Sequence, residues 1–194
     1  MAVVTALRER PRGRVEIELD GAPWRLVPAD AVVRAGLAVG RSLDRETARS
    51  LGRELRRFRA LGAAARALHH RDLSRRGLEE RLARHGAPPG ARSDALAALE
   101  RAGLVDDGRF ATARAQALAA RGYGDAAIRF DLDREGVPAE IAAEAVTVLE
   151  PEAERARRLA AGRGAGARTA RWLSARGFSA TSVEDAVAGF AEET

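Results

Sequence analysis

The chain has 194 residues, no cysteine and few aromatic side chains, at 4% of the total. Without cysteine it can form no disulfide, no thiolate nucleophile and no cysteine zinc site. All 33 basic residues are arginine, and the formal net charge of +5 favours acidic or polyanionic partners. No stretch approaches the roughly 18 uninterrupted apolar residues of a membrane span. We therefore expect a cytoplasmic protein that does not contact the membrane.

Short alternating segments near the N-terminus predict β-strands. Residues 15–19 alternate apolar and acidic side chains, the period of a half-buried strand. Residues 20–23 predict a turn, and residues 24–27 a returning strand. Residues 3–7 are a candidate third strand. The sequence therefore predicts a small β-hairpin segment.

Helical patterns follow this segment. Residues 29–37 predict a short helix that stops at Gly36, and Asp44 is a good N-cap for the next helix. That second helix carries four residues near one face: Thr47, Leu51, Leu55 and Phe58. Because a small sheet has little core of its own, we expect the strands to pack against this helix.

From residue 63 onward the sequence repeats, with offsets of 50 and then 41 residues. Each repeat has a leucine four residues before a glycine: Leu82/Gly86, Leu132/Gly136 and Leu173/Gly177. A further apolar or methyl-bearing residue comes four positions earlier: Leu78, Ile128 and Thr169. Another leucine precedes each glycine by 18 residues, and apolar residues follow it by 10 and 13: Leu68, Leu96 and Leu99; Leu118, Val146 and Leu149; Leu159, Val187 and Phe190.

This spacing predicts three short helices in each repeat. The second helix ends at the glycine, which can adopt the left-handed conformation of a C′ residue. Helices this short are marginal alone and must pack together around the leucines. We expect a mainly α-helical protein: an N-terminal hairpin and helix (1–60), then three-helix repeats at 61–103, 104–150 and 151–194. Stacked repeats predict an elongated, curved arrangement.

Candidate catalytic patterns have simpler explanations. The glycines of residues 162–168 lack the preceding strand of a nucleotide-binding loop and predict a linker. The histidines show no metal-ligand spacing. Asp106 and Asp107 are adjacent carboxylates, but Asp106 fits a helix N-cap, with Val105 and Phe110 as the apolar pair that brackets it. We expect no enzyme, no metal and no cofactor.

Arginines accompany each second helix. Because the repeated apolar positions face inward, most of these arginines should project outward and form basic faces. The candidate partner-binding residues are Arg75, Arg76, Arg81, Arg84, Arg121, Arg129, Arg134, Arg168, Arg171 and Arg176. Two stretches are especially basic: residues 49–71 carry seven arginines and one acid, and residues 155–176 carry seven arginines and no acid. Such faces could bind a nucleic-acid backbone or a protein filament on one, or could simply be solvated.

Several stretches together resemble the RecX family, bacterial modulators of the RecA recombinase. Their order and spacing, more than any single motif, carry the resemblance, which covers essentially the whole chain. The matching stretches are LSRRGLEERLARHG (73–86), AGLVDDGRFA (102–111), RGYGDAAIRFDLDREGV (121–137) and RTARWLSARGF (168–178). Gly77 departs from the family's usual glutamate, and Pro88-Pro89-Gly90 replaces a more ordinary polar helix start.

The resemblance implies a non-enzymatic regulator. Such a protein would bind as a monomer in the groove of the RecA–DNA filament, suppress ATP hydrolysis and strand exchange, and limit filament growth. The alternative is a basic helical protein that binds nucleic acid directly, because a three-helix unit with a basic helix also resembles a DNA reader. Weak basic contacts with single- or double-stranded DNA fit either hypothesis.

Overall fold

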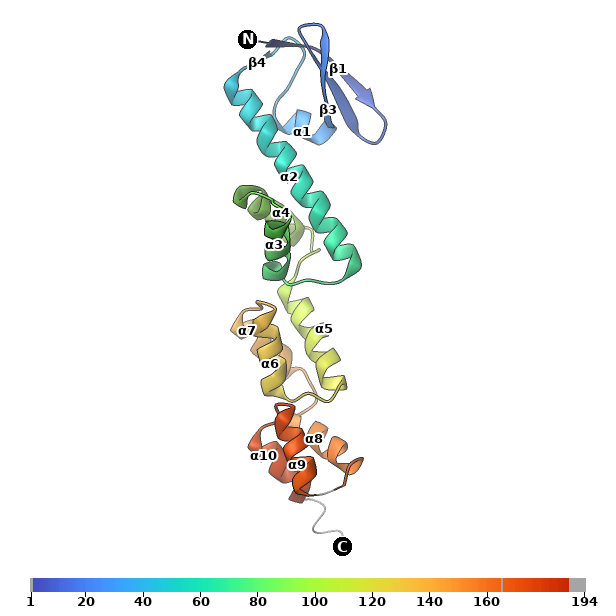
Figure 1. Cartoon of the computed structure of the whole chain (residues 1–194), viewed down its shortest axis with the longest axis vertical. Coiled ribbons are helices and arrows are strands. Elements are labelled where there is room, and N and C mark those ends of the chain that lie inside the picture. Colours follow the sequence, from blue (N-terminus) through green and yellow to red (C-terminus); the bar gives the residue numbers. More distant parts are fainter. Residues whose placement is uncertain (1, 165, 189–194) are drawn as a thin grey trace. The chain divides into compact units, whose positions relative to one another are not determined.

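The N-terminal segment forms a four-stranded antiparallel sheet. The computed structural model describes residues 2–164 and 166–188. Its strands are β1 (Ala2–Arg10), β2 (Arg14–Leu19), β3 (Ala22–Pro28) and β4 (Ser42–Leu43). They are ordered β3-β2-β1-β4, so β3 and the very short β4 form the two edges (Figure 1). The three predicted strands are confirmed, and β4 has no periodic signal of its own in two residues.

The predicted turn at residues 20–23 is shorter in the structure. Asp20 and Gly21 alone make it, both with positive φ (48° and 82°), as a tight hairpin turn requires. Ala22 and Pro23 already pair with β2. Proline is tolerated there because β3 is an edge strand and its backbone nitrogen need not donate to a neighbour.

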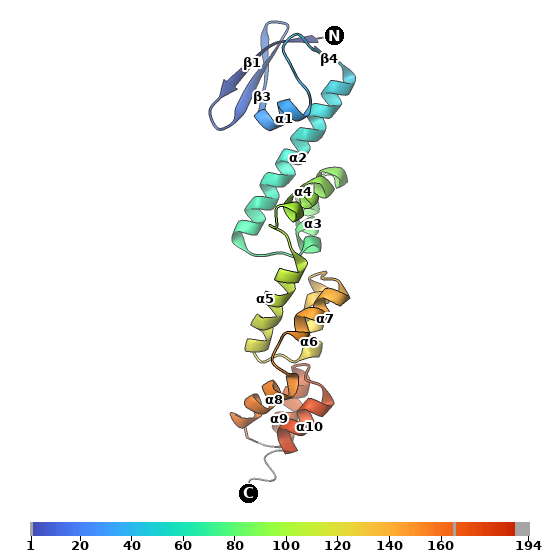
Figure 2. The ribbon, with the colours of Figure 1, turned by 180° about the vertical axis from the view of Figure 1, so that it is seen from behind.

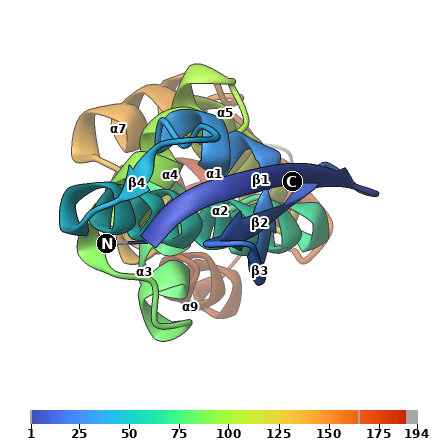
Figure 3. The ribbon, with the colours of Figure 1, turned by 90° about the horizontal axis from the view of Figure 1, so that it is seen from above.

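The sheet packs against α1 (Ala29–Arg34) and the first half of α2 (Arg45–His70), as seen from above in Figure 3. Val4, Ile17 and Val27 of the strands are at most 1% exposed, and they share one core with Val32 of α1 and Leu51 of α2. The expectation that the strands pack on this helix is confirmed, since strand residues alone do not make up the core.

Helix α2 is a single helix of 26 residues. Its N-cap is Asp44, whose carboxylate accepts a hydrogen bond of 2.7 Å from the Thr47 N–H, and this bond holds the pKa of Asp44 below its ordinary value. Phe58, placed by its spacing beside buried Leu51, is 49% exposed. α2 also runs across position 60, so residues on both sides of the predicted boundary at 60/61 belong to one helix.

Eight shorter helices follow. They are α3 (Arg75–Arg84), α4 (Pro89–Arg101), α5 (Asp107–Ala120), α6 (Asp125–Arg134), α7 (Ala139–Thr147), α8 (Glu152–Ala161), α9 (Ala167–Ala175) and α10 (Ala180–Ala188). Two compact units contain all of these elements. The first unit holds residues 2–71 and 78–102, and the second holds residues 72–77 and the described residues from Gly103 onward. Within the second unit, α5–α7 and α8–α10 each pack as a three-helix group (Figures 1 and 2).

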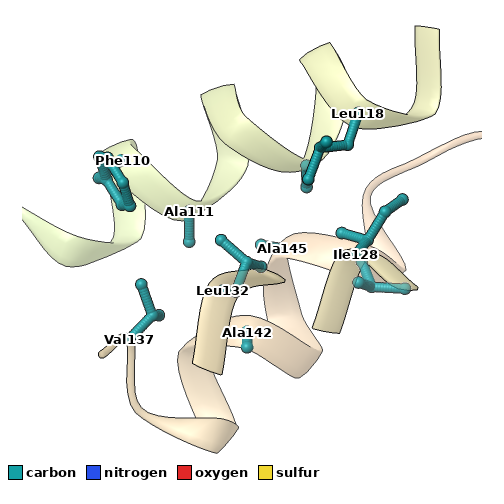
Figure 4. Close-up of a cluster of buried hydrophobic side chains, with 10 residues drawn as sticks. Phe110, Ala111, Leu118, Ile128, Leu132, Val137, Ala142 and Ala145 are labelled. Carbon is teal, nitrogen blue, oxygen red and sulfur yellow. The ribbon is translucent and has the colours of Figure 1, made fainter. Parts of the chain in front are cut away.

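The repeated apolar residues form the cores of these groups. Ile128 and Leu132 of α6 are 0% exposed and lie against Ala111 of α5 and Ala145 of α7 (Figure 4). The equivalent residues Leu78, Leu82, Thr169 and Leu173 are also buried. Phe190, the last residue of the repeated pattern, lies outside the described residues.

The predicted helix-ending glycines adopt the left-handed conformation, with φ of 76° at Gly86, 79° at Gly136 and 79° at Gly177. The mainly helical fold with a small N-terminal sheet is therefore confirmed. The elongated, curved arrangement and the residue ranges assigned to each repeat stay predictions. Among the described residues, no helix combines the length and apolarity needed to cross a membrane.

Candidate basic faces and the joints between helix groups

Some of the ten candidate arginines project into solvent, and others contact neighbouring groups of the molecule. On α3, Arg75 and Arg76 belong to the second unit, whereas Arg81 and Arg84 belong to the first. Arg75, Arg76 and Arg84 are exposed and Arg81 is half-buried. The side chain of Arg76 packs against Gly136. If residue 136 carried a Cβ, that atom would lie 2.3 Å from the Arg76 Cδ. This arginine therefore contacts the next helix group with its aliphatic stem.

The two candidate arginines of α6 project into solvent beside acids of their own helix. Arg129 lies 3.9 Å from Asp125 and is 51% exposed, and Arg134 lies 3.0 Å from Asp131 and is 65% exposed. Exposed ion pairs of this kind contribute about 0.2–1 kcal/mol and are readily exchanged for an external partner. Both guanidinium groups therefore remain available to an anionic surface.

Arg176 is engaged within the molecule. Its guanidinium carbon lies 4.4 Å from the ring centre of Trp172 and 5.1 Å from that of Tyr123, and its Nη1 donates to the Arg121 carbonyl at 2.8 Å. Arg163 lies 3.8 Å from the same Trp172 ring centre. The side chain of Arg176 thus links α5 to α9, which weakens the case for it as a free binding residue.

Arg121, Arg168 and Arg171 are exposed. The guanidinium carbon of Arg121 lies 5.6 Å from the ring centre of Tyr123. Arg168 lines a surface hollow of about 350 Å³ together with Arg163 and Trp172. The structure thus brings Arg168 beside a second arginine and an aromatic ring, but it gathers no single site from all of the candidate arginines.

Arg155, which the sequence patterns did not single out, is buried at the joint between the last two helix groups. It is 3% exposed, and its guanidinium donates to the carbonyls of Glu150 and Tyr123 at 2.9 Å each and also binds Asp125. The only sequence signal was its place in the basic stretch 155–176. Nothing local distinguishes it from its exposed neighbours, because its partner Asp125 lies 30 residues away.

Glu152 completes this joint from the first residue of α8. Its carboxylate accepts hydrogen bonds from the Asp125 N–H (2.7 Å) and from the hydroxyls of Ser179 (2.6 Å) and Ser182 (3.0 Å). The negative charge therefore lies at the N-terminal ends of α6 and α10, where helix dipoles favour it. Burial raises the pKa of Glu152, but these hydrogen bonds outweigh burial and leave the pKa below its ordinary value.

The preceding joint repeats this geometry. Asp107, the first residue of α5, accepts a hydrogen bond of 2.7 Å from the Arg75 N–H at the start of α3. The end of α6 is tied back as well, because the Ser74 hydroxyl donates to the Glu135 carbonyl at 2.5 Å. At the next joint, a backbone contact takes the equivalent place: the Gly124 N–H donates to the Arg176 carbonyl at 2.9 Å. The start of α3 therefore contacts α5 and the end of α6 in the same pattern in which the start of α6 contacts α8 and the end of α9.

The other feature missed from the sequence is a basic groove in the first unit, here called the α2 groove. Two adjacent hollows of about 470 and 300 Å³ form it, between α2 and the end of α3. Its charged and imidazole side chains are Arg56, Arg59, Arg66, His70, Arg81 and His85. The signal was the stretch 49–71 with its seven arginines.

In the part of the chain that the structure describes, no cluster of histidine and acidic residues could hold a metal ion.

Comparison with protein families places residues 106–146 in a family model described as the second three-helix domain of RecX. These residues cover α5, α6 and nearly all of α7. The regulatory protein RecX of Halorhodospira halophila is 36% identical over 141 residues, which cover 68% of this chain and 88% of that relative. The regulatory protein RecX of Chromohalobacter salexigens is 38% identical over 143 residues, covering 68% of this chain and 92% of the relative.

Solved structures show the same fold. A crystal structure of a regulatory protein RecX superposes with a TM-score of 0.84 at 21% identity, over 97% of this chain and all of the other. RecX from Lactobacillus salivarius superposes with a TM-score of 0.63 at 17% identity, over 71% of this chain and 97% of the other. At such low sequence identity, the superpositions establish the fold alone. The family is established by the more similar relatives named above.

Proposed function

We propose that this chain, which belongs to the RecX family, regulates the RecA recombinase by binding along the groove of the RecA–DNA filament. Bound there as a monomer, it suppresses ATP hydrolysis and strand exchange and limits filament growth. The partner is thus a protein filament assembled on DNA, and the chain itself performs no chemistry.

The repeated joint is the observation that carries this proposal. Asp107, the first residue of α5, accepts from the start of α3, and Glu152, the first residue of α8, accepts from the start of α6, so α5–α7 and α8–α10 each begin with the same hydrogen-bonding pattern. A filament presents identical protomers at regular intervals, and a body with regularly repeated groups can contact several of them. Each contact raises the effective concentration for the next, so weak individual contacts add up to tight binding.

The decisive experiment is a titration of this protein into RecA that is hydrolysing ATP on single-stranded DNA. Because one bound molecule would contact several protomers, we expect hydrolysis to fall at less than one molecule per RecA. Unchanged hydrolysis at equimolar protein would refute the proposal.

The α6 arginines provide the residue-level test. Replacing Arg129 and Arg134 by glutamate should weaken inhibition while leaving the circular dichroism spectrum unchanged, because both side chains are exposed. The matched control replaces Arg34 and Arg45, exposed residues of the first unit, by glutamate and changes the net charge equally. Equal inhibition by the α6 variant and the wild type would remove Arg129 and Arg134 from the binding face.

Direct action on DNA is the competing function, and the exposed arginines are the observation that favours it. A protein of that kind would bind naked DNA with nanomolar affinity and base-sequence preference, and would leave RecA ATPase unaffected. The regulator instead binds naked DNA weakly and with strong salt dependence. DNA-binding measurements alongside the ATPase titration therefore separate the two functions.

A further inference from the structure

We propose that the α2 groove of the first unit is a binding site for the sugar–phosphate backbone of a nucleic-acid strand, independent of base sequence. This site goes beyond the proposed contacts with RecA and lies on a different set of residues. It involves none of the candidate arginines of α6 and α9, and of those of α3 only Arg81.

The residues that line the groove from α2 lie on one face of that helix. Arg56, Arg59, Ala63, Arg66 and His70 are separated by three, four, three and four positions, the spacing that keeps side chains on one side of an α-helix. Arg81 and His85 face them from the end of α3 and the residue after it. The groove is therefore positive on both of its sides.

The charge of the groove is not balanced from within. None of the described residues that line it is acidic. Arg56, Arg59, Arg66 and Arg81 make no ion pair with any other described residue, in contrast to Arg57 on another face of α2, which lies 3.4 Å from Glu54. Four arginines gathered without counter-charges repel one another, and a bound polyanion removes that repulsion.

Alanines keep the groove open. Ala60, Ala63 and Ala67 lie on this face of α2 and line its floor. Ala63 is half-buried, so a longer side chain at this position would project into the space between the arginines. The chain thus combines a stripe of small residues with flanking long cations, a shape that admits a narrow, uniformly charged ligand.

The lining favours backbone contact over base recognition. Among the described residues, no phenylalanine, tyrosine or tryptophan lines the two hollows, so the groove lacks the large aromatic rings on which successive bases stack. Guanidinium groups bind phosphate oxygens through paired hydrogen bonds. Arg56 and His70 are 14 residues apart, or about 21 Å at the rise of an α-helix. That span covers several phosphates, which follow one another at about 3.4 Å along each strand of a duplex.

Fluorescence anisotropy with a labelled mixed-sequence oligonucleotide, without RecA, tests the site. The test variant of the full-length protein replaces Arg59 and Arg66 by glutamine. Losing two phosphate contacts should weaken binding to single-stranded DNA about tenfold or more in low salt, and should reduce the slope of log K against log salt by about 1.4. The duplex of the same sequence should lose affinity in the same direction.

The control replaces Arg34 and Arg101 by glutamine, which removes two charges from the same unit at a hollow that also contains Glu54 and Asp94. We expect this control to keep the wild-type affinity and slope. Equal losses in both variants would show that only net charge matters and would overturn the site. Competition by polyglutamate as strong as that by DNA of equal charge would overturn it too, because an acidic protein surface would then be the ligand. Because both results compare variants or competitors without RecA, neither bears on whether the protein inhibits RecA ATPase.

Discussion

At the scale of single residues, the charged side chains divide into those that hold the molecule together and those that face solvent. Arg155 and Glu152 belong to the first kind. The guanidinium of Arg155 is buried with Asp125 as its partner. The carboxylate of Glu152 accepts hydrogen bonds from backbone N–H groups at the N-terminal ends of α6 and α10. Arg129 and Arg134 belong to the second kind. Arg155, Arg129 and Arg134 are all arginines, so burial and the acidic partner, not the residue type, distinguish the buried one from the two exposed ones.

Glu152→Ala should lower the free energy of unfolding by roughly 1–3 kcal/mol, because hydrogen bonds to a charged group are lost. The pKa of Glu152 is lower in the folded state, so its contribution is present above the ordinary glutamate pKa and is lost as the pH falls through the folded value. Urea unfolding between pH 7 and pH 3 checks both effects. The wild type should lose more stability on acidification than the variant, while Glu154→Ala, exposed in the same helical turn, should behave like the wild type.

Gly124→Ala tests the close approach of α6 to the end of α9. A Cβ at Gly124 would lie 2.3 Å from the Gly177 carbonyl oxygen, although the φ of −82° suits alanine. Overpacking of this kind costs about 1–3 kcal/mol. Gly90→Ala in α4, with no atom within 4 Å of the new Cβ, is the control and should not lower the melting temperature, because alanine is the better helix former. Equal melting temperatures for both variants would contradict the packed joint.

At the scale of secondary-structure elements, capping residues decide where the helices begin. Asp106 is the N-cap of α5, and its carboxylate accepts a hydrogen bond of 2.9 Å from the Arg109 N–H. Val105 and Phe110 are both buried on either side of it, which is the predicted apolar pair. The neighbouring Asp107 does more than follow the cap, because it also holds the start of α3. The paired aspartates therefore join elements.

Asp106→Ala should cost about 1 kcal/mol of stability, the usual value of an N-cap. Thermal unfolding measures this loss, and Asp133→Ala, exposed within α6, serves as the control with a smaller effect. The ATPase assay adds a second readout. If Asp106→Ala abolished RecA inhibition at a temperature where the variant stays folded, Asp106 would contact the partner directly and its role as a cap alone would be wrong.

At the scale of the whole molecule, the structure holds two compact units, and the second contains two three-helix groups connected by the Arg155 and Glu152 contacts. Arg155→Met should loosen this connection before the groups themselves unfold, because it removes three polar contacts and leaves Asp125 with only the exposed Arg129, 3.9 Å away. Breaking a buried ion pair in this way costs about 3–5 kcal/mol.

Hydrogen exchange measures this effect residue by residue. The amides of Gly124 and Ala126, which donate to the carbonyls of Arg176 and Gly177, should exchange faster in Arg155→Met. Amides in the middle of α5 should stay protected. Arg158→Met, which removes an exposed arginine that lies 2.6 Å from Glu150, is the control and should leave Gly124 and Ala126 as slow as in the wild type.

Local patterns in the sequence determined the helices, the hairpin and the cores. Leucine and glycine spacing identified Leu82/Gly86 and its equivalents because burial and helix ending depend on residues within a few turns. The continuity of α2 was missed because the sequence pattern suggested a new helix after residue 60, whereas the structure has one helix throughout. The repeated sequence therefore specifies the groups, although not every boundary between them.

Only the tertiary structure decided which arginines are buried as structural contacts and which are exposed. Arg155 and Arg158 are neighbours in one basic stretch, yet one is buried beside Asp125 and the other is exposed beside Glu150. The α2 groove likewise depends on Arg81 and His85, which face the arginines of α2 only after the chain has turned back. Short-range periodicity determines an element and its buried face. The partner of a charge is set by residues far along the chain, and no local pattern contains that information.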